Sequence, residues 1–304
     1  MTAAVPPLPS TKAPPDKAAP GPNVVAALFW MAMALCAFVL VAISGRAAGK
    51  GIDTMHLMFY RSIIGLLLIT MLAWFSPAGL RQLATARLWH HGLRNTIHFV
   101  AQYSWLSALL LIPLTELIAI EFTAPLWVAL LAPLVLKERL TLSRVVAATL
   151  GFIGVLVIIR PGTVPISDGT MFAVVAALGF AGSMIVTKQL VRTETILCFL
   201  FHMSWMQLVM AWLPLIDRLE VPSAEVVPWI IAIALAGMMA HFSLARAFTH
   251  ADAMIVAPMD FMRLPLLMGV GVVLYGEAVD PMVLLGAVVV IAANLINIVR
   301  ERRR

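Results

Sequence analysis

Charged residues are scarce in this sequence. Only 12% of its 304 residues are Asp, Glu, Lys or Arg, which is about half the share found in soluble globular domains. Hydrophobic residues make up 62% of the chain, and they gather in runs of roughly 20 residues, the length of helix that crosses a bilayer. The composition therefore excludes a soluble domain and predicts an all-α integral membrane protein.

Motifs for several kinds of chemistry are missing as well. The two cysteines, Cys36 and Cys198, lie in apolar runs and show neither a disulfide framework nor CxxC spacing. No pair of His or Cys residues shares metal-ligand spacing with a carboxylate on one helix face, so neither a metal nor a cofactor is expected. A GxxxxGK[ST] sequence is absent, which excludes direct ATP drive from this chain. The loops also lack the clustered aspartates of intramembrane enzymes, and a single chain lacks the rings of like charge typical of channels.

The net charge of +6 does not indicate a nucleic-acid partner. The basic residues lie at the ends of apolar runs, as expected for loops that obey the positive-inside rule. The two tails, together with every second connection between apolar runs and the adjoining ends of those runs, hold fifteen Lys and Arg residues. The remaining connections hold only four: Arg46, Lys50, Arg160 and Arg218. This asymmetry predicts that both termini lie in the cytoplasm. Residues 1–23, rich in Pro and Ala, are expected to form a disordered cytoplasmic tail, and residues 300–304 a basic one.

Ten apolar segments, each expected to be one transmembrane helix, can be marked along the chain. They are roughly 24–44, 54–75, 92–111, 114–136, 142–160, 169–188, 195–216, 226–247, 252–275 and 281–299. Several connectors are only a few residues long, so neighbouring helices must run antiparallel.

The chain also repeats itself at an offset of 139 residues. This offset pairs Ser104 with Ser243, Glu121 with Asp260 and Phe122 with Phe261, and it aligns further Ala and Glu positions. The two halves, residues 24–160 and 169–299, each hold five segments. Because five is odd, the second half enters the membrane from the opposite side, which predicts two inverted five-helix repeats.

The order of several short motifs resembles a known family. FYRS, which contains Arg61, LVLKERLT at the end of the fourth segment and VVLYGEAVD at the end of the ninth are similar to the ten-helix, EamA-type branch of the drug/metabolite transporter superfamily. The segments IIRPG and GMMAHFSLARAF resemble segments found in the sub-branch of this family that includes bacterial riboflavin and S-adenosylmethionine transporters. The resemblance implies a carrier of a small organic metabolite in the bacterial inner membrane, with uptake of a vitamin such as riboflavin expected first. S-adenosylmethionine transport and export of amino acids or metallophore-like metabolites are alternatives.

Two carboxylates lie within apolar segments. Glu121 and Asp260 each come seven residues after a segment's start, which at about 1.5 Å per residue puts each about 10 Å deep. Burial there costs on the order of 2.5–3.5 kcal/mol, and such groups normally face a partner or a polar interior. Arg263 is expected to pair with Asp260, and Arg61 to reach Glu121 or Glu116. Substrate contact, proton coupling and a purely structural ion pair all remain open.

Polar and aromatic residues also form stripes at helical spacing. A pocket lined by them would suit a planar, amphipathic substrate, although packing within the bundle would place them in the same pattern. Together with the charged residues of the apolar segments, they give the full set of candidate substrate-binding residues: Arg61, His98, Gln102, Trp105, Glu121, His202, Trp205, His241, Asp260 and Arg263. Small residues in the fifth and tenth segments, such as Gly154 and Gly286, predict close helix packing, either within the chain or in a homodimer. The expected partners are a small-molecule substrate and the lipid bilayer.

Overall fold

The computed structural model describes residues 23–136, 142–162, 166–190, 193–250, 256 and 259–302. Apart from Asn23, the expected N-terminal tail lies outside the described residues, as do Glu138 and the last two arginines. The expected C-terminal tail begins inside the last helix, which continues to Arg302.

The described residues form eleven α-helices and two 3₁₀ turns. They are α1 (Val24–Ala48), α2 (Thr54–Phe75), η1 (Gly79–Leu83), α3 (Leu88–Leu111), α4 (Leu114–Glu121), α5 (Ala124–Leu136), α6 (Leu142–Ile159), α7 (Asp168–Leu190), α8 (Ile196–Trp212), η2 (Leu213–Leu215), α9 (Val227–His250), α11 (Arg263–Tyr275) and α12 (Pro281–Arg302). Short polar side chains define several starts: Asn23, Asp53 and Thr195 accept hydrogen bonds from backbone N–H groups in the first turns of α1, α2 and α8.

Among the described residues, six helices are long and apolar enough to cross a membrane, and one of these spans α4 and part of α5. Three further apolar helices are shorter. The 24-residue α3 is long enough, but it carries Arg94, Asn95, His98 and Gln102 and is correspondingly less hydrophobic. Many large apolar side chains, such as Leu67 and Val273, lie exposed on the outside of the bundle. The protein is therefore an all-α, multi-pass membrane protein.

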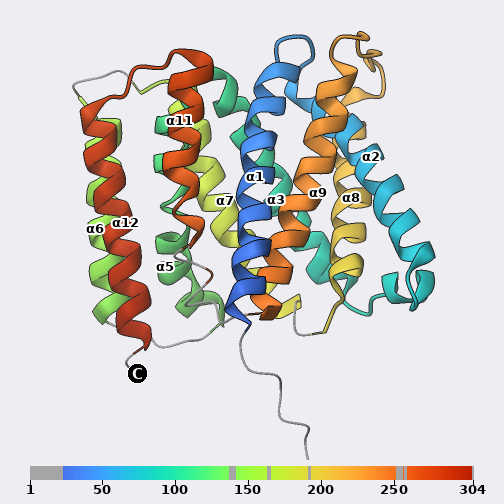
Figure 1. Ribbon diagram of the computed structural model, residues 1–304, viewed down its shortest axis with the longest axis horizontal. Helices are drawn as coiled ribbons and strands as arrows, with labels where there is room; N and C mark the ends of the chain where they lie inside the picture. The colour runs from blue at the N-terminus through green and yellow to red at the C-terminus, as the bar shows by residue number, and fades with distance from the viewer. Residues whose placement is uncertain are drawn as a thin grey trace, which may run out of the picture.

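The helices pack in long-range pairs, as Figure 1 shows. α1 packs along α9, α3 along α7, α2 along α8, and α6 along α12. Gly49, at the end of α1, packs against the Leu110 side chain near the end of α3. Gly169, in the first turn of α7, packs against the neighbouring Leu111. Thus α1 ends, and α7 begins, at one end of the bundle, called here the α1–α2 end. The opposite end, where α3 and α8 begin, is the α2–α3 end.

Helix boundaries recur at the offset found in the sequence. α3 and α9 begin 139 residues apart, at Leu88 and Val227. α5 and α11 also begin 139 residues apart, at Ala124 and Arg263.

Two expected continuous helices are interrupted, so the prediction of unbroken segments there was wrong. α4 ends at Glu121, and a turn at Phe122–Thr123 precedes α5. Likewise Asp260 lies in a helical turn, Phe261 and Met262 form a turn, and α11 follows. The rings of Phe122 and Phe261 lie 5.5 Å apart. The Phe122 carbonyl, released from the helix by the break, accepts a hydrogen bond from Asn294 Nδ2 at 2.9 Å.

The small residues of α6 and α12 pack against each other within the chain. A Cβ added to Gly286 would lie 2.7 Å from the Gly154 carbonyl oxygen, so the two backbones approach too closely for larger residues. These two glycines therefore serve packing between the halves of one chain.

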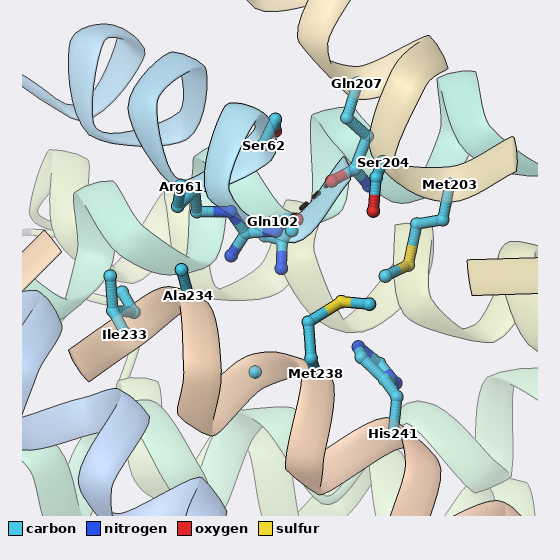
Figure 2. Close-up of a pocket in the computed structure, with 12 residues that line it drawn as sticks. Arg61, Ser62, Gln102, Met203, Ser204, Gln207, Ile233, Ala234, Met238 and His241 are labelled. Atoms are coloured by element: carbon cyan, nitrogen blue, oxygen red, sulfur yellow. Dashed lines mark hydrogen bonds between the residues drawn. The ribbon is translucent and has the colours of Figure 1, made fainter. Parts of the chain in front are cut away.

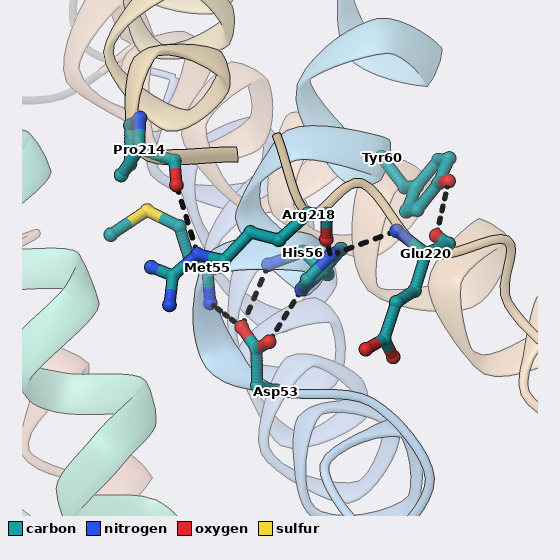
Figure 3. A network of polar contacts seen from close by, with 7 residues as sticks. All are labelled: Asp53, Met55, His56, Tyr60, Pro214, Arg218 and Glu220. Atoms are coloured by element: carbon teal, nitrogen blue, oxygen red, sulfur yellow. Dashed lines mark hydrogen bonds and ion pairs between the residues drawn. The ribbon is translucent and has the colours of Figure 1, made fainter. Parts of the chain in front are cut away.

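Polar contacts tie the α1–α2 end together. In Figure 3 the buried His56 ring binds the Asp53 carboxylate through Nδ1, while its Nε2 lies 3.0 Å from the Arg218 carbonyl oxygen and accepts from the Glu220 N–H at 3.1 Å. The Tyr60 hydroxyl donates to the Glu220 carbonyl at 2.6 Å. The start of α2 is thereby joined to the connection between η2 and α9.

Candidate functional site

The two helix interruptions bring together four of the predicted site residues, which we call the acidic centre: Trp105, Glu121, Asp260 and Arg263. Arg263 Nη1 lies 2.9 Å from Glu121 Oε1, and its Nη2 lies 3.2 Å from Asp260 Oδ2. Trp105 Nε1 donates to the other Glu121 oxygen at 2.7 Å. The predicted pair of Asp260 and Arg263 is thus present, and Arg263 also joins the carboxylate of the other half.

The acidic centre is enclosed but not fully paired. The Arg263 guanidinium lies over the Phe38 ring at 4.6 Å and the Phe122 ring at 5.2 Å, an arrangement that favours the cation. Asp260 Oδ1 and Arg263 Nε are buried and have no hydrogen-bond partner among the described residues. Two carboxylates share one guanidinium, so the centre has hydrogen-bonding capacity and negative charge left for another group.

A second polar group, the Arg61 pocket, lies between α2, α3, α8 and α9 (Figure 2). Arg61 Nη2 donates to Gln102 Oε1 at 2.5 Å and to Gln207 Oε1 at 3.2 Å. Gln207 Nε2 and His98 Nδ1 lie 2.9 Å apart, and the His98 ring is 5.8 Å from the His241 ring. Four predicted residues, Arg61, His98, Gln102 and His241, are therefore neighbours.

The Arg61 pocket is small in this conformation. Its cavity volume of about 20 Å³ is enough for about one water molecule. Its walls include the flexible side chains of Met203 and Met238 and the hydroxyls of Ser62 and Ser204. Binding of an organic metabolite here requires the helices around it to separate.

The expected contact of Arg61 with an acidic residue does not appear among the described hydrogen bonds and ion pairs. Arg61 instead binds two neutral amides, and Glu116 accepts a hydrogen bond from Thr170 Oγ1 at 2.8 Å. The reason is geometric: Arg61 lies on the face of α2 toward α3 and α8, whereas Glu121 is drawn to Arg263 at the helix breaks.

One face of α3 connects the two polar groups. His98 and Gln102 belong to the Arg61 pocket region, and Trp105 belongs to the acidic centre. Gln102 and Trp105 are three residues apart, so they are separated by about 4.5 Å along the helix axis. The stripe predicted on this segment thus lies between two adjacent polar sites.

The stripe predicted on α8 lies elsewhere. Trp205 Nε1 donates to His202 Nδ1 at 2.8 Å, and His202 Nε2 binds the Leu83 carbonyl oxygen at 3.0 Å. These contacts occupy both ring nitrogens and fasten α8 to η1. Neither residue lines the Arg61 pocket. Gln207 does line it and was missed, although an amide inside an apolar segment is the same signal that indicated Gln102.

Comparison with known proteins finds similar transporters. Residues 25–160 match the EamA-like transporter family. A riboflavin transporter of Rhizobium johnstonii is 29% identical over 293 residues, which cover 94% of each chain. An S-adenosylmethionine uptake transporter of Rickettsia prowazekii is 26% identical over 275 residues, covering 90% of this chain and 92% of that protein. The chain is thus similar to the EamA-like transporter family over residues 25–160 and to named metabolite transporters over most of its length.

These similarities confirm the resemblance found in the motifs. The protein is a membrane transporter of a small metabolite. A solved crystal structure, 17% identical, shares its fold with a TM-score of 0.63 and covers 91% of this chain and 99% of that one.

Proposed function

We propose that this protein is a secondary carrier that works by alternating access, with residues 24–160 and 169–299 as inverted repeats. The helix pairing supports this. Exchange of the two halves turns the α1–α9 pair into the α7–α3 pair, and it leaves the α2–α8 and α6–α12 pairs unchanged. Such exchange is expected when a two-fold axis in the membrane plane relates the halves.

The helix interruptions support the same arrangement. Glu121 and Asp260 are 139 residues apart, each directly before a turn, and the following Phe122 and Phe261 are in contact. Discontinuous helices at the interface of two repeats are typical of substrate sites near the middle of the bilayer. The observation that carries our proposal is that both interruptions meet at one incompletely paired acidic centre.

We propose that cargo binds between the acidic centre and the Arg61 pocket when the helices separate. Riboflavin is the first candidate, because two relatives carry its name: the Rhizobium protein and a Brucella anthropi transporter that is 28% identical over 273 residues. Its flavin ring needs hydrogen-bond donors and acceptors beside flat apolar surface. Gln102, Gln207 and His241 offer the former, and Trp105 offers the latter.

S-adenosylmethionine is the second candidate, and the charge distribution favours it. Its sulfonium and ammonium groups would find the excess negative charge of Glu121 and Asp260. Its carboxylate would find Arg61, whose described hydrogen bonds go to neutral amides. The Rickettsia relative is named for uptake of this compound.

We propose a bacterial inner-membrane location with the α1–α2 end outside and both termini in the cytoplasm. The start of α1 and the end of α12 lie at the same end of the bundle (Figure 1). Contacts between the halves at the α1–α2 end include Arg46 with Glu277 and Arg160 with Asp280. We infer that these contacts help to hold the two halves together on the proposed outer side.

The test is uptake of labelled riboflavin and labelled S-adenosylmethionine into proteoliposomes. We expect one of them to be taken up, and Glu121→Gln and Asp260→Asn each to reduce uptake at least tenfold, which corresponds to about 1.4 kcal/mol. Glu116→Gln is the matched control, because this carboxylate lies on the same helix but binds Thr170. Uptake by Glu116→Gln should stay within about twofold of wild type, which corresponds to less than about 0.5 kcal/mol.

Normal uptake in both acidic-centre variants would overturn the site. If neither compound is taken up while a wider panel of metabolites yields another substrate, both candidate cargoes are wrong but the carrier stands. Cysteine-accessibility mapping tests the architecture: chain ends on opposite sides of the membrane, or positions 121 and 260 sealed from water in every state, would contradict alternating access at this centre.

A further inference from the structure

We propose that His91, Glu194 and Cys198 form a zinc site at the α2–α3 end of the bundle, separate from the transport site. Each residue offers a ligand atom, and these atoms all lie within 4.8 Å of one another. His91 lies in the first turn of α3, Glu194 in the connection before α8, and Cys198 in the first turn of α8.

The imidazole of His91 supplies the independent observation. His91 is fully buried, and neither ring nitrogen has a hydrogen-bond partner among the described residues. A buried polar group without a partner is costly, and most such groups in native proteins are paired. The neighbouring His202 ring, 4.6 Å away, has both nitrogens engaged by Trp205 and Leu83. A lone pair of His91 is thus free to bind a metal beside a thiol and a carboxylate.

The other two ligands are already held in place. Cys198 Sγ donates to Glu194 Oε2 at 3.1 Å, so the two groups lie as close as ligands of one tetrahedral ion. Thr85 Oγ1 donates to the other Glu194 oxygen at 2.7 Å and orients the carboxylate. Outer contacts of this kind commonly fix ligand orientation in metal sites.

The donor set selects the metal. A thiolate disfavours Mg²⁺ and Ca²⁺, and sulfur, imidazole and carboxylate together suit Zn²⁺. Three protein ligands leave a fourth position for water. On binding, the S–H bond of Cys198 breaks, an S–Zn bond forms, and the proton passes to buffer. The thiolate and carboxylate then balance the charge of the ion. Arg94 opposes binding, although its guanidinium is stacked over Phe199 at 4.4 Å and donates to Asn95.

The sequence-based expectation of no metal site missed this cluster for a clear reason. Glu194 and Cys198 have helical i, i+4 spacing, but Glu194 precedes the N-cap residue Thr195 and so reads as a loop residue. His91 comes from α3, more than a hundred residues away in sequence. Ion binding would join the first half of the chain to the second at the α2–α3 end.

The experiment uses the purified full-length protein in detergent, with any affinity tag removed, titrated with Zn²⁺ by calorimetry and with Co²⁺ by visible absorption. We expect one Zn²⁺ per chain and a thiolate-to-cobalt charge-transfer band. Cys198→Ser and His91→Phe should each weaken binding at least about 100-fold, because even outer contacts are worth about 10–100-fold in metal affinity. Cys36→Ser is the matched control, since this second cysteine lies exposed on α1, and it should bind as wild type does.

Three results would overturn the site: no saturable Zn²⁺ binding by wild type, equal affinity in Cys198→Ser, or equal affinity in His91→Phe. Circular dichroism of the metal-free variants verifies that they are folded. If a variant does not fold, alkylation of the wild type decides. Zn²⁺ should slow labelling of Cys198 and leave Cys36 unaffected, and equal rates for Cys198 with and without Zn²⁺ would exclude coordination by its thiol.

Discussion

Loss of the Arg263 guanidinium should destabilise the protein more than loss of either carboxylate that it binds. Arg263 lies 2.9 Å from Glu121 and 3.2 Å from Asp260, with side chains 12%, 10% and 27% exposed, respectively. In Arg263→Gln both carboxylates remain, close together and without a cation. Removing one partner of a buried ion pair typically costs about 3–5 kcal/mol, because the other charge stays buried.

Neutralising one acid leaves a pair intact, so the expected losses are smaller. Glu121→Gln removes one charge-assisted hydrogen bond, worth about 1.5–3 kcal/mol, and the amide oxygen can still accept from Trp105. Asp260→Asn should cost about 1 kcal/mol or less, because its carboxylate is the most exposed of the three groups. The triple neutral variant should recover most of the stability lost in Arg263→Gln, since no uncompensated charge remains.

The assay is reversible unfolding in mixed micelles with increasing SDS, followed by tryptophan fluorescence. Arg246→Gln serves as control: this guanidinium lies 5.6 Å from the Trp30 ring in a cation–π contact, so its loss should cost about 0.5–1 kcal/mol. If Arg263→Gln is no less stable than Glu121→Gln, or if the triple variant is as unstable as Arg263→Gln, the acidic centre is not held by its charge balance.

Two further predictions concern packing and pH. Gly286→Ala should destabilise the protein by about 1–3 kcal/mol in the same unfolding assay, because the added Cβ would lie 2.7 Å from the Gly154 carbonyl oxygen. Gly269→Ala is the control: its added Cβ would meet nothing within 4 Å, so this variant should be as stable as wild type or slightly more stable. The backbone N–H of Met282 and the Arg160 guanidinium lower the pKa of Asp280 below its ordinary value of 3.8. Its stabilising contribution is therefore complete above about pH 4 and lost as pH falls through the lowered pKa, so thermal unfolding scans from pH 6 to 3 should show a smaller decrease for Asp280→Asn than for wild type.

Hydropathy and spacing predicted much of the helical framework. The segment expected at 54–75 coincides with α2, and that at 142–160 ends one residue beyond α6. The interruptions after Glu121 and Asp260 were only partly predictable. Pro125 and Pro265 lie close after them and permit a kink, but the turns at Phe122–Thr123 and Phe261–Met262 contain no Gly or Pro and are as apolar as a helix interior. Such turns are stabilised by tertiary contacts, such as the Asn294 side chain, which sequence periodicity does not report.

Most members of the two polar groups were predicted from the sequence, apart from Gln207, but their grouping was not. Local spacing was enough to predict the ion pair of Asp260 with Arg263, since these residues are three positions apart. It was not enough for Arg61, whose partners Gln102 and Gln207 come from two other helices. The packing of α2 against α3 and α8 decides that choice, and no one-dimensional pattern contains it.

The four basic residues that depart from the positive-inside pattern show a related limit. Three of them form contacts at the α1–α2 end: Arg46 binds Glu277 and the Leu109 and Ile112 carbonyl oxygens, Arg160 binds Asp280, and Arg218 donates to the Pro214 carbonyl oxygen. A count of loop charges treats such residues as solvated. Here three of the four residues bind carboxylates or backbone carbonyl oxygens at the α1–α2 end. They therefore weigh less against the predicted orientation in the membrane than their number suggests.

The geometry of α3 gives the two polar groups a physical reason to act together. This helix packs along α7 of the other half, and one of its faces carries Gln102 at the Arg61 pocket and Trp105 at Glu121. A helix moves as a rigid body over the distance of one turn, so any rotation of α3 that releases Gln102 from Arg61 must also shift the Trp105 donor at Glu121. If cargo binds there as proposed, we expect opening of the pocket and exposure of the acidic centre to be coupled through this helix. Cargo that bridges the two groups would stabilise a conformation that neither group reaches alone.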